Sequence, residues 1–231
     1  MMDTSQRVAV LTYNCSHRKT YDTLCLLKAR GYDNIVVYAH SMMYRKRYQP
    51  LIEHRPQNII EYPLPENICS NFGYTYAFVK DYDNIQEGKD TVFLLCGAGL
   101  IDDNFIKNHR IINSHPGYIP FARGLDAYKW EIYDNLPIGV TTHFLGKYID
   151  AGEIIERREI LVGQYDTFHS VAERVYQNEI DMLVGSIEKV NDPHEFMLPQ
   201  EGFPVHMRMP HEKEKDLFNR FRNRKPFLIK C

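Results

Sequence analysis

The stretch that decides the fold lies near the N-terminus, where residues 8–38 read VAVLTYNCSHRKTYDTLCLLKARGYDNIVVY. Residues 8–11 and 35–38 are short apolar runs that indicate buried strands. Between them, residues 19–30 carry apolar side chains at helical spacing, and Gly31 follows as a helix stop. A strand, a helix and a second strand within about 30 residues predict the βαβ unit of a parallel sheet.

The same alternation continues along the chain and predicts an α/β fold: a Rossmann-like, mostly parallel twisted sheet with helices on both faces. Residues 1–190 are expected to form the main domain and residues 191–231 a mixed C-terminal extension. Further strands are expected at residues 58–62, 91–95, 110–113, 137–144 and 153–161. Further helices are expected at residues 69–82, 103–108, 125–135 and 166–190.

The composition is that of an ordinary globular protein, with 231 residues, 44% of them hydrophobic and 25% charged. A formal net charge of -2 disfavours nucleic acid as the main partner, because nucleic-acid-binding proteins are usually more basic. Apolar runs are too short for a transmembrane helix or a signal peptide. We therefore expect a cytoplasmic protein with no membrane partner. The five scattered cysteines predict neither a disulfide framework nor a zinc site.

Ligands bind such sheets at the carboxyl ends of strands, and the run NSHPGYIPFARG at residues 113–124 follows a predicted strand. Asn113 and His115 are two residues apart, so on extended chain they share one face. An amide and an imidazole aimed together can hydrogen-bond a developing oxyanion and move a proton. Asp150 stands in a turn between the next two predicted strands, where its carboxylate can orient His115. Taken singly, each of these motifs is more often structural than catalytic.

No metal site is predicted. His109, His115 and His143 lack the spacing of the common zinc motifs.

Taken together, NSHPGYIPFARG and GVTTHFLGKYIDAGEII (residues 139–155) resemble the formyltransferase superfamily that uses 10-formyltetrahydrofolate. The family pattern is N-x-H-P-(S/G)-x-x-P-x-x-(R/K)-G, then G-V-T-x-H, then D-x-G-x-I, and this chain matches every position in order. The resemblance is strongest over residues 93–160 and fades after residue 190. It implies a formyltransferase catalytic domain with 10-formyltetrahydrofolate as cosubstrate.

The resemblance also implies roles for individual residues. Asn113 and protonated His115 would stabilise the oxyanion formed when a substrate amine attacks the formyl carbon, and Asp150 would align His115 and raise its pKa. The segments that correspond to the pterin site contain Gly99, Leu100, Ile101, Gly146, Lys147, Tyr148 and Ile149. The candidates for acceptor binding are Tyr13, Asn14 and Arg123, and the position of Arg123 implies that it either contacts the acceptor or supports the loop.

The turn at residues 12–17, TYNCSH, narrows the class of acceptor substrate. It lacks the glycines of the phosphate loop in glycinamide ribonucleotide transformylases. The motif variant is similar to that of small nucleotide-sugar N-formyltransferases. This similarity implies a dTDP-, UDP- or GDP-linked amino-dideoxy sugar, a role in lipopolysaccharide O-antigen or related glycan synthesis, and a homodimer. Two alternatives stay open: a ribonucleotide-amine formyltransferase of purine synthesis, and a catalytically silent folate-binding regulatory protein.

Two charged segments are expected on the surface. In residues 41–56, the side chains that would reach a diphosphate are Tyr44, Arg45 and Arg47. Residues 211–225 pair acids with bases at helical spacing and predict an exposed helix that docks through Leu217, Phe218 and Phe221. The alternative role for this tail, in holding a nucleotide or a second subunit, would involve Arg220, Arg222 and Arg224.

Overall fold

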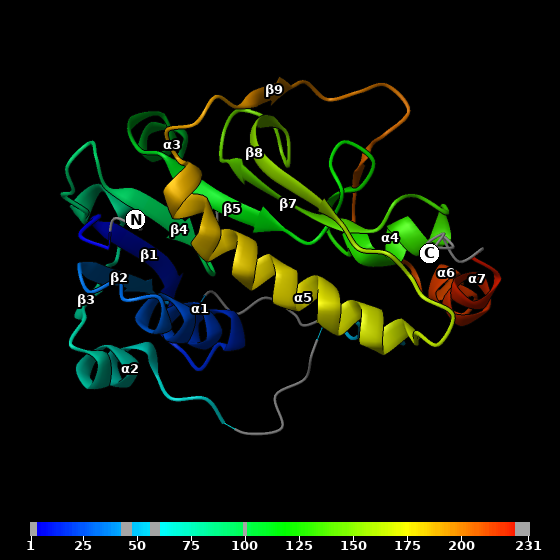
Figure 1. Cartoon of the computed structure of the whole chain (residues 1–231), viewed down its shortest axis with the longest axis horizontal. Helices are drawn as coiled ribbons and strands as arrows, with labels where there is room; N and C mark the ends of the chain where they lie inside the picture. The colour runs from blue at the N-terminus through cyan, green and yellow to red at the C-terminus, as the bar shows by residue number, and fades with distance from the viewer. Residues whose placement is uncertain (1–3, 43–47, 56–60, 99–100, 225–231) are drawn as a thin grey trace.

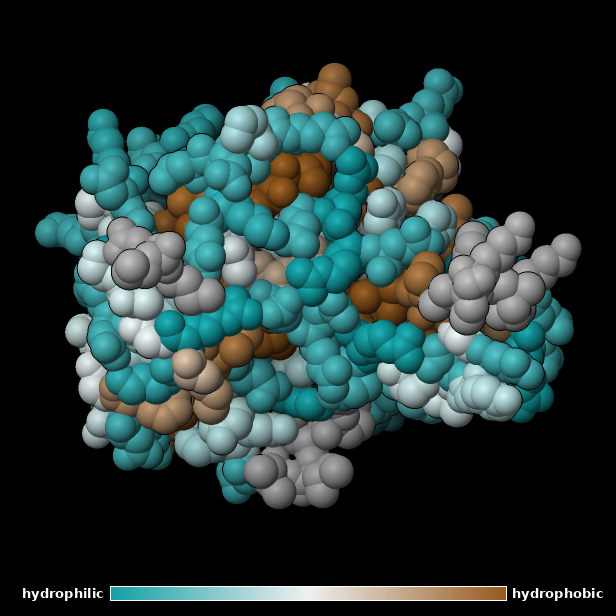
Figure 2. Space-filling model, in the orientation of Figure 1, coloured by the Kyte–Doolittle hydropathy of each residue, from teal (hydrophilic) through white to brown (hydrophobic). Residues whose placement is uncertain are grey.

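The structure is a computed structural model, and it describes residues 4–42, 48–55, 61–98 and 101–224. Within these ranges the chain forms a mixed eight-stranded sheet with helices on both faces (Figure 1). The surface in front of this sheet is largely hydrophilic, with hydrophobic side chains showing in separate patches (Figure 2). No helix in the described ranges is long and apolar enough to cross a membrane.

The strands in chain order are β1 (Val8–Tyr13), β2 (Ile35–His40), β3 (Thr75–Phe78), β4 (Val92–Leu95), β5 (Ile111–His115), β6 (Arg123–Gly124), β7 (Gly139–Phe144), β8 (Gly152–Glu159), β9 (Glu195–Met197) and β10 (Val205–His206). The helices are α1 (Arg18–Ala29), α2 (Pro65–Phe72), α3 (Asp103–Asn108), α4 (Ala127–Tyr133), α5 (Phe168–Gly185), α6 (His211–Glu214) and α7 (Leu217–Asn223), with short 3-10 turns η1 (Tyr82–Asn84) and η2 (Ser186–Lys189).

The sheet order is β3-β2-β1-β4-β5-β7-β8-β9. All pairings from β3 to β5 are parallel, and β5, β7, β8 and β9 pair antiparallel. The α/β fold with a mixed, mostly parallel sheet is therefore confirmed. The change from parallel to antiparallel pairing occurs at β5, the strand that carries the predicted catalytic residues.

Both faces of the central strands are buried, which explains why they are continuous apolar runs in the sequence. On β1, Val8 and Val10 pack with α1 and α5, the yellow helix that crosses the sheet in Figure 1. Ala9 and Leu11 point to the opposite face, where they share a cluster with Phe105 of α3. The alternation places one helical layer on each side of the strand.

The prediction of a helix at residues 69–82 is wrong. Helix α2 instead begins at Pro65, which suits the first helical turn because its missing N–H has no partner there. It ends at Gly73, whose φ of 75° is the left-handed conformation that caps helices. The chain then enters edge strand β3, because Thr75 and Tyr76 favour extended backbone. Most of the strand expected at residues 58–62 lies outside the described residues.

The C-terminal tail differs from the single exposed helix that its charges predict. It forms two short helices, α6 and α7, and Leu217 and Phe221 are buried as expected, whereas Phe218 stays 39% exposed. Arg220 donates to the Tyr133 carbonyl, and Arg224 donates to the Glu131 and Leu136 carbonyls. Arg220 and Arg224 therefore bind the end of α4, and Arg222 is exposed.

Candidate active site

Strand β5 carries Asn113 and His115 on one face, as their spacing predicts, and β7 places His143 opposite Asn113 in the antiparallel register. The Asn113 side-chain nitrogen lies 3.3 Å from Nε2 of His143. Nδ1 of His143 donates to the Phe144 carbonyl at 3.0 Å, so its Nε2 is the acceptor of the Asn113 amide. This bond fixes the direction of the Asn113 side chain.

Asp150 lies between the two imidazoles. One carboxylate oxygen is 3.5 Å from Nδ1 of His115 and the other is 3.5 Å from Nε2 of His143. Nε2 of His115 donates to the Ala122 carbonyl at 3.0 Å, which leaves Nδ1 as the proton-accepting atom of the neutral ring. A proton taken at Nδ1 is therefore stabilised by the Asp150 carboxylate. The structure thus brings Asn113, His115 and Asp150 together as predicted.

The dipeptide Arg123-Gly124 holds the turn that carries Asp150. The Arg123 guanidinium is buried and donates to the carbonyls of Ile149 and Asp150 at 2.7–3.1 Å. The Gly124 N–H donates to the Asp150 carboxylate at 2.8 Å. A Cβ on Gly124 would lie 2.2 Å from the His206 carbonyl, so only glycine fits there. Arg123 therefore supports the Asp150 turn, one of the two roles that the motif implies for it.

The loop that follows His115 is tied down at several points. Thr141 donates to the Gly117 carbonyl and accepts from the Ile119 N–H, while Glu131 accepts from the Tyr118 N–H at 2.5 Å. A Cβ on Gly117 would come within 2.5 Å of Nε2 of His115. The glycine of the H-P-G motif is thus needed for the close approach of the loop to the imidazole.

Burial affects the pKa values of His115 and Asp150. Burial lowers the pKa of His115, and the nearby Asp150 carboxylate only partly opposes that effect. Asp150 thus raises the pKa of His115 as expected, but burial outweighs that effect, and the resting ring is neutral near pH 7. Burial alone would raise the pKa of Asp150, but His115, His143 and the Gly124 N–H together lower it below its usual value.

A second buried ionic cluster lies behind β5, and sequence reasoning missed it. Nζ of Lys19 on α1 is 2.7 Å from the Glu179 carboxylate on α5, and Arg55 reaches the other Glu179 oxygen at 3.3 Å. Lys19 also donates to the carbonyl of Ser114, the residue between Asn113 and His115, at 3.3 Å. The ion pair therefore anchors the backbone of the catalytic strand.

The charges of this cluster act on their neighbours. Burial raises the pKa of Glu179, and the two cations lower it. The net result is a pKa below its usual value. Burial, Lys19 and Arg55 together lower the pKa of His17 to about 4. His54 likewise has a pKa well below its usual value, because it is buried beside Arg55 and Lys129. Both imidazoles are neutral at pH 7 as a result.

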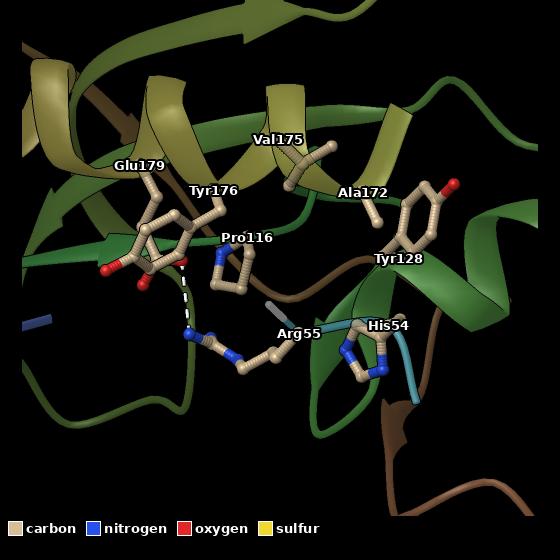
Figure 3. Close-up of a pocket in the computed structure, with 8 residues that line it drawn as sticks. All are labelled: His54, Arg55, Pro116, Tyr128, Ala172, Val175, Tyr176 and Glu179. Carbon is tan, nitrogen blue, oxygen red and sulfur yellow. Dashed lines mark ion pairs between the residues drawn. The ribbon is translucent and has the colours of Figure 1, made fainter. Parts of the chain in front are cut away.

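A pocket opens next to the catalytic loop (Figure 3). Pro116, which follows His115, forms one wall, and Glu179 and Tyr176 of α5 lie beside it. The other residues that line it are His54, Arg55, Tyr128, Ala172 and Val175. The empty space is about 240 Å³, part of it open to solvent. Without that open space the cavity is about 10 Å³, room for about one water molecule.

The predicted pterin-binding residues fall into two groups. Tyr148 and Ile149 are 37% and 62% exposed beside Asp150, so their apolar surfaces are available to a flat ring. Ile101 packs against the core beneath β4. Gly99 and Leu100 lie outside the described residues, as do Tyr44, Arg45 and Arg47.

The predicted acceptor residues Tyr13 and Asn14 are engaged within the protein. The Tyr13 hydroxyl donates to the Ala98 carbonyl at 2.5 Å, and its ring packs where a Cβ on Gly97 would collide with it. The Asn14 side chain accepts from the Tyr76 hydroxyl at 2.9 Å. Both side chains at this turn therefore make hydrogen bonds within the protein.

Comparison with known proteins agrees with the motif. Residues 76–187 match the family model described as formyl transferase. Over 95 residues the chain is 32% identical to dTDP-4-amino-4,6-dideoxyglucose formyltransferase of Mycobacterium tuberculosis, which covers 41% of this chain and 38% of the relative. Over 83 residues it is 29% identical to phosphoribosylglycinamide formyltransferase of Bacillus subtilis, covering 35% and 43% of the two chains. The chain therefore spans less than half the length of these curated relatives.

The fold also matches a solved structure, the N-formyltransferase from Helicobacter canadensis in complex with folinic acid and dTDP-3-aminofucose. The TM-score is 0.61 at 15% sequence identity, covering 87% of this chain and 71% of the other. At this identity the likeness shows a shared fold.

Proposed function

We propose, from the premise that this chain is an enzyme of the formyl transferase family, that it formylates the amine of a nucleotide-linked amino sugar with 10-formyltetrahydrofolate. The observation that carries the proposal is the position of the Asp150 carboxylate between His115 and His143. The Asn113 amide is hydrogen-bonded to His143 beside it. This arrangement supplies a neutral base, an anion that stabilises its protonated form and an amide donor.

The reaction follows from these groups. The acceptor nitrogen forms a bond to the formyl carbon, and the bond from that carbon to the folate nitrogen breaks. Asn113 donates a hydrogen bond to the formyl oxygen as negative charge develops there. His115 takes the amine proton at Nδ1, beside Asp150, and returns it to the departing nitrogen. The lowered pKa of His115 suits this role, because the ring starts without the proton.

The donor fits the turn beside Asp150. 10-Formyltetrahydrofolate supplies the formyl group, and its flat pterin needs apolar stacking surface with polar groups at its edge. The exposed side chains of Tyr148 and Ile149 offer that surface, and Arg123 holds the backbone carbonyls beneath them. Gly146 and Lys147 belong to the same proposed donor site.

We place the acceptor at the mouth of the pocket beside Pro116. Arg55 lines this pocket, and its guanidinium can donate hydrogen bonds to the hydroxyls of a sugar. The nucleotide would extend outside the pocket, where the 49% exposed Arg55 side chain can meet a diphosphate. We place the reaction in the cytoplasm and in O-antigen or related glycan synthesis, and we keep a homodimer as a prediction.

A transfer assay tests this proposal. The chain is incubated with 10-formyltetrahydrofolate and dTDP-, UDP- or GDP-linked amino sugars, with glycinamide ribonucleotide in parallel, and products are identified by mass spectrometry. We expect formylation of one amino sugar and none of the ribonucleotide. Formylation of the ribonucleotide alone would move the enzyme to purine synthesis. Folate binding without any transfer would favour a regulatory protein.

A further inference from the structure

The C-terminal extension contacts the segment at residues 48–55 at three successive points. The Tyr48 hydroxyl donates to the Met209 carbonyl at 2.6 Å. Nε2 of His211 donates to the Gln49 carbonyl at 2.9 Å. The Leu51 N–H donates to the Glu214 carboxylate at 2.7 Å. The two parts are about 160 residues apart in the sequence, so these contacts are tertiary. They follow the same order along both segments.

The Glu214 contact is buried and ionic. Both Glu214 and its partner Lys129 on α4 are fully buried, and Lys129 donates to the Glu214 oxygen that Leu51 does not use. Ile52 joins the same apolar cluster as Met209. Burying a charge pair is costly unless its remaining positions are satisfied, and the Leu51 N–H satisfies one of them.

The segment anchored in this way ends in the pocket. His54 and Arg55 come after Ile52 and Glu53, and both line the pocket beside Pro116 (Figure 3). His54 stacks on Tyr128 at a ring distance of 6.0 Å, and Arg55 reaches Glu179. In the described part of the chain, His54 and Arg55 are the pocket residues contributed from outside the catalytic loop, α4 and α5.

We propose that the C-terminal extension is a positioning element for the acceptor: residues 209–214 hold residues 48–55 so that His54 and Arg55 complete the acceptor pocket. Glu214 is the central positioning residue, because its carboxylate joins α4 to the Leu51 backbone. This inference rests on the proposed function, since it takes the pocket as the acceptor site. It assigns the extension to acceptor binding and leaves the folate side to β8 and its turn.

Two double variants separate the Leu51 contact from the buried charges. Lys129→Met/Glu214→Gln removes the ion pair but keeps an amide oxygen that can accept the Leu51 N–H. Lys129→Met/Glu214→Met removes both. Tyr48→Phe, which deletes one hydroxyl, is a milder third variant, and Glu212→Gln on the exposed side of α6 is the control.

The measurements are the KM for dTDP-4-amino-4,6-dideoxyglucose as probe, kcat, the Kd for 5-formyltetrahydrofolate, and hydrogen exchange at the Leu51 amide. We expect Glu214→Met to raise KM about tenfold relative to Glu214→Gln in the same background, with kcat and the folate Kd within about twofold. Tyr48→Phe should raise KM by a smaller factor, and Glu212→Gln should match wild type. Exchange at Leu51 should be faster in the Met variant than in the Gln variant.

The positioning role would be overturned if the KM were the same in the two double variants and in Tyr48→Phe. The proposed function would stay intact in that case. A parallel loss of folate affinity would also overturn it, because the extension would then support the whole fold. Wild-type protein that formylates no amino sugar would overturn the proposed function, and the inference with it.

Discussion

Two buried carboxylates lie on either side of β5, and their difference separates catalysis from support. Asp150 and Glu179 each have a pKa below the usual value and each stand between two basic side chains. The partners of Asp150 are the imidazoles of His115 and His143, whose ring nitrogens can accept or donate a proton. The partners of Glu179 are the ammonium group of Lys19 and the guanidinium group of Arg55, which form ion pairs with it. One cluster can move a proton, and the other holds a fixed charge.

The two clusters are also positioned differently. Asp150 sits in a turn with a φ of 44°, a left-handed conformation that Asp tolerates, and the clamp by Arg123 and Gly124 keeps it there. Glu179 sits in the middle of α5, where the helix alone fixes its backbone. The carboxylate that we propose to be catalytic, Asp150, depends on its neighbours for its geometry, whereas Glu179 depends on them for charge balance.

The largest expected effect tests the proton-moving cluster. His115→Ala should lower kcat by at least about 100-fold, because it removes the base that takes the amine proton. Steady-state kinetics with the preferred amino sugar measures this loss, and His169→Ala on the exposed start of α5 is the matched control. Near-normal turnover in His115→Ala would show that the assigned mechanism is wrong.

The supporting cluster should respond in stability. Lys19→Met leaves the buried Glu179 carboxylate without its closest cation, at a cost of about 3 kcal/mol in the free energy of unfolding. The double variant Lys19→Met/Glu179→Met removes the charge as well and should recover most of that loss. Urea denaturation of both variants measures it. If the double variant is no more stable than the single, Lys19 does not act through Glu179.

The supporting cluster also predicts a pH dependence. The pKa of His17 falls from 6.5 to about 4 on folding. At pH values between these two, the His17 imidazole is protonated in the unfolded chain and neutral in the folded chain. The free energy of unfolding should therefore fall as pH drops, by about 2 kcal/mol from this residue between pH 7 and pH 5. Chemical denaturation at both pH values should show a smaller fall in His17→Gln, and an equal fall would contradict the assignment.

The smallest expected effect concerns Asn113. Asn113→Ala should lower kcat about tenfold with little change in folate affinity, because its bond to the formyl oxygen strengthens in the transition state. Kinetics together with 5-formyltetrahydrofolate binding measures the two effects. A large loss of affinity at unchanged kcat would reassign Asn113 to donor binding.

The sequence predicted the proton-moving cluster and missed the supporting one for a physical reason. Asn113, His115 and Asp150 lie in short segments whose turns and strand ends determine their neighbours locally. Lys19 and Glu179 come from α1 and α5, so their contact depends on how these helices pack across the sheet.

Charge patterning misled the interpretation of the tail for a related reason. Glu214 lies in a run of alternating charges that predicts a solvated helix, yet it is fully buried against Lys129. The helix expected at residues 69–82 failed more locally, because apolar spacing outweighed the stop signal at Gly73. Tertiary pairing decided the first outcome and backbone conformation decided the second.

The most direct test of the central claim is product analysis by mass spectrometry after incubation with 10-formyltetrahydrofolate and the panel of nucleotide-linked amino sugars, for wild type and His115→Ala side by side. We expect a formylated amino sugar from wild type and almost none from the variant. Equal product from both proteins, or no formylated sugar from wild type that binds 5-formyltetrahydrofolate, would contradict the account.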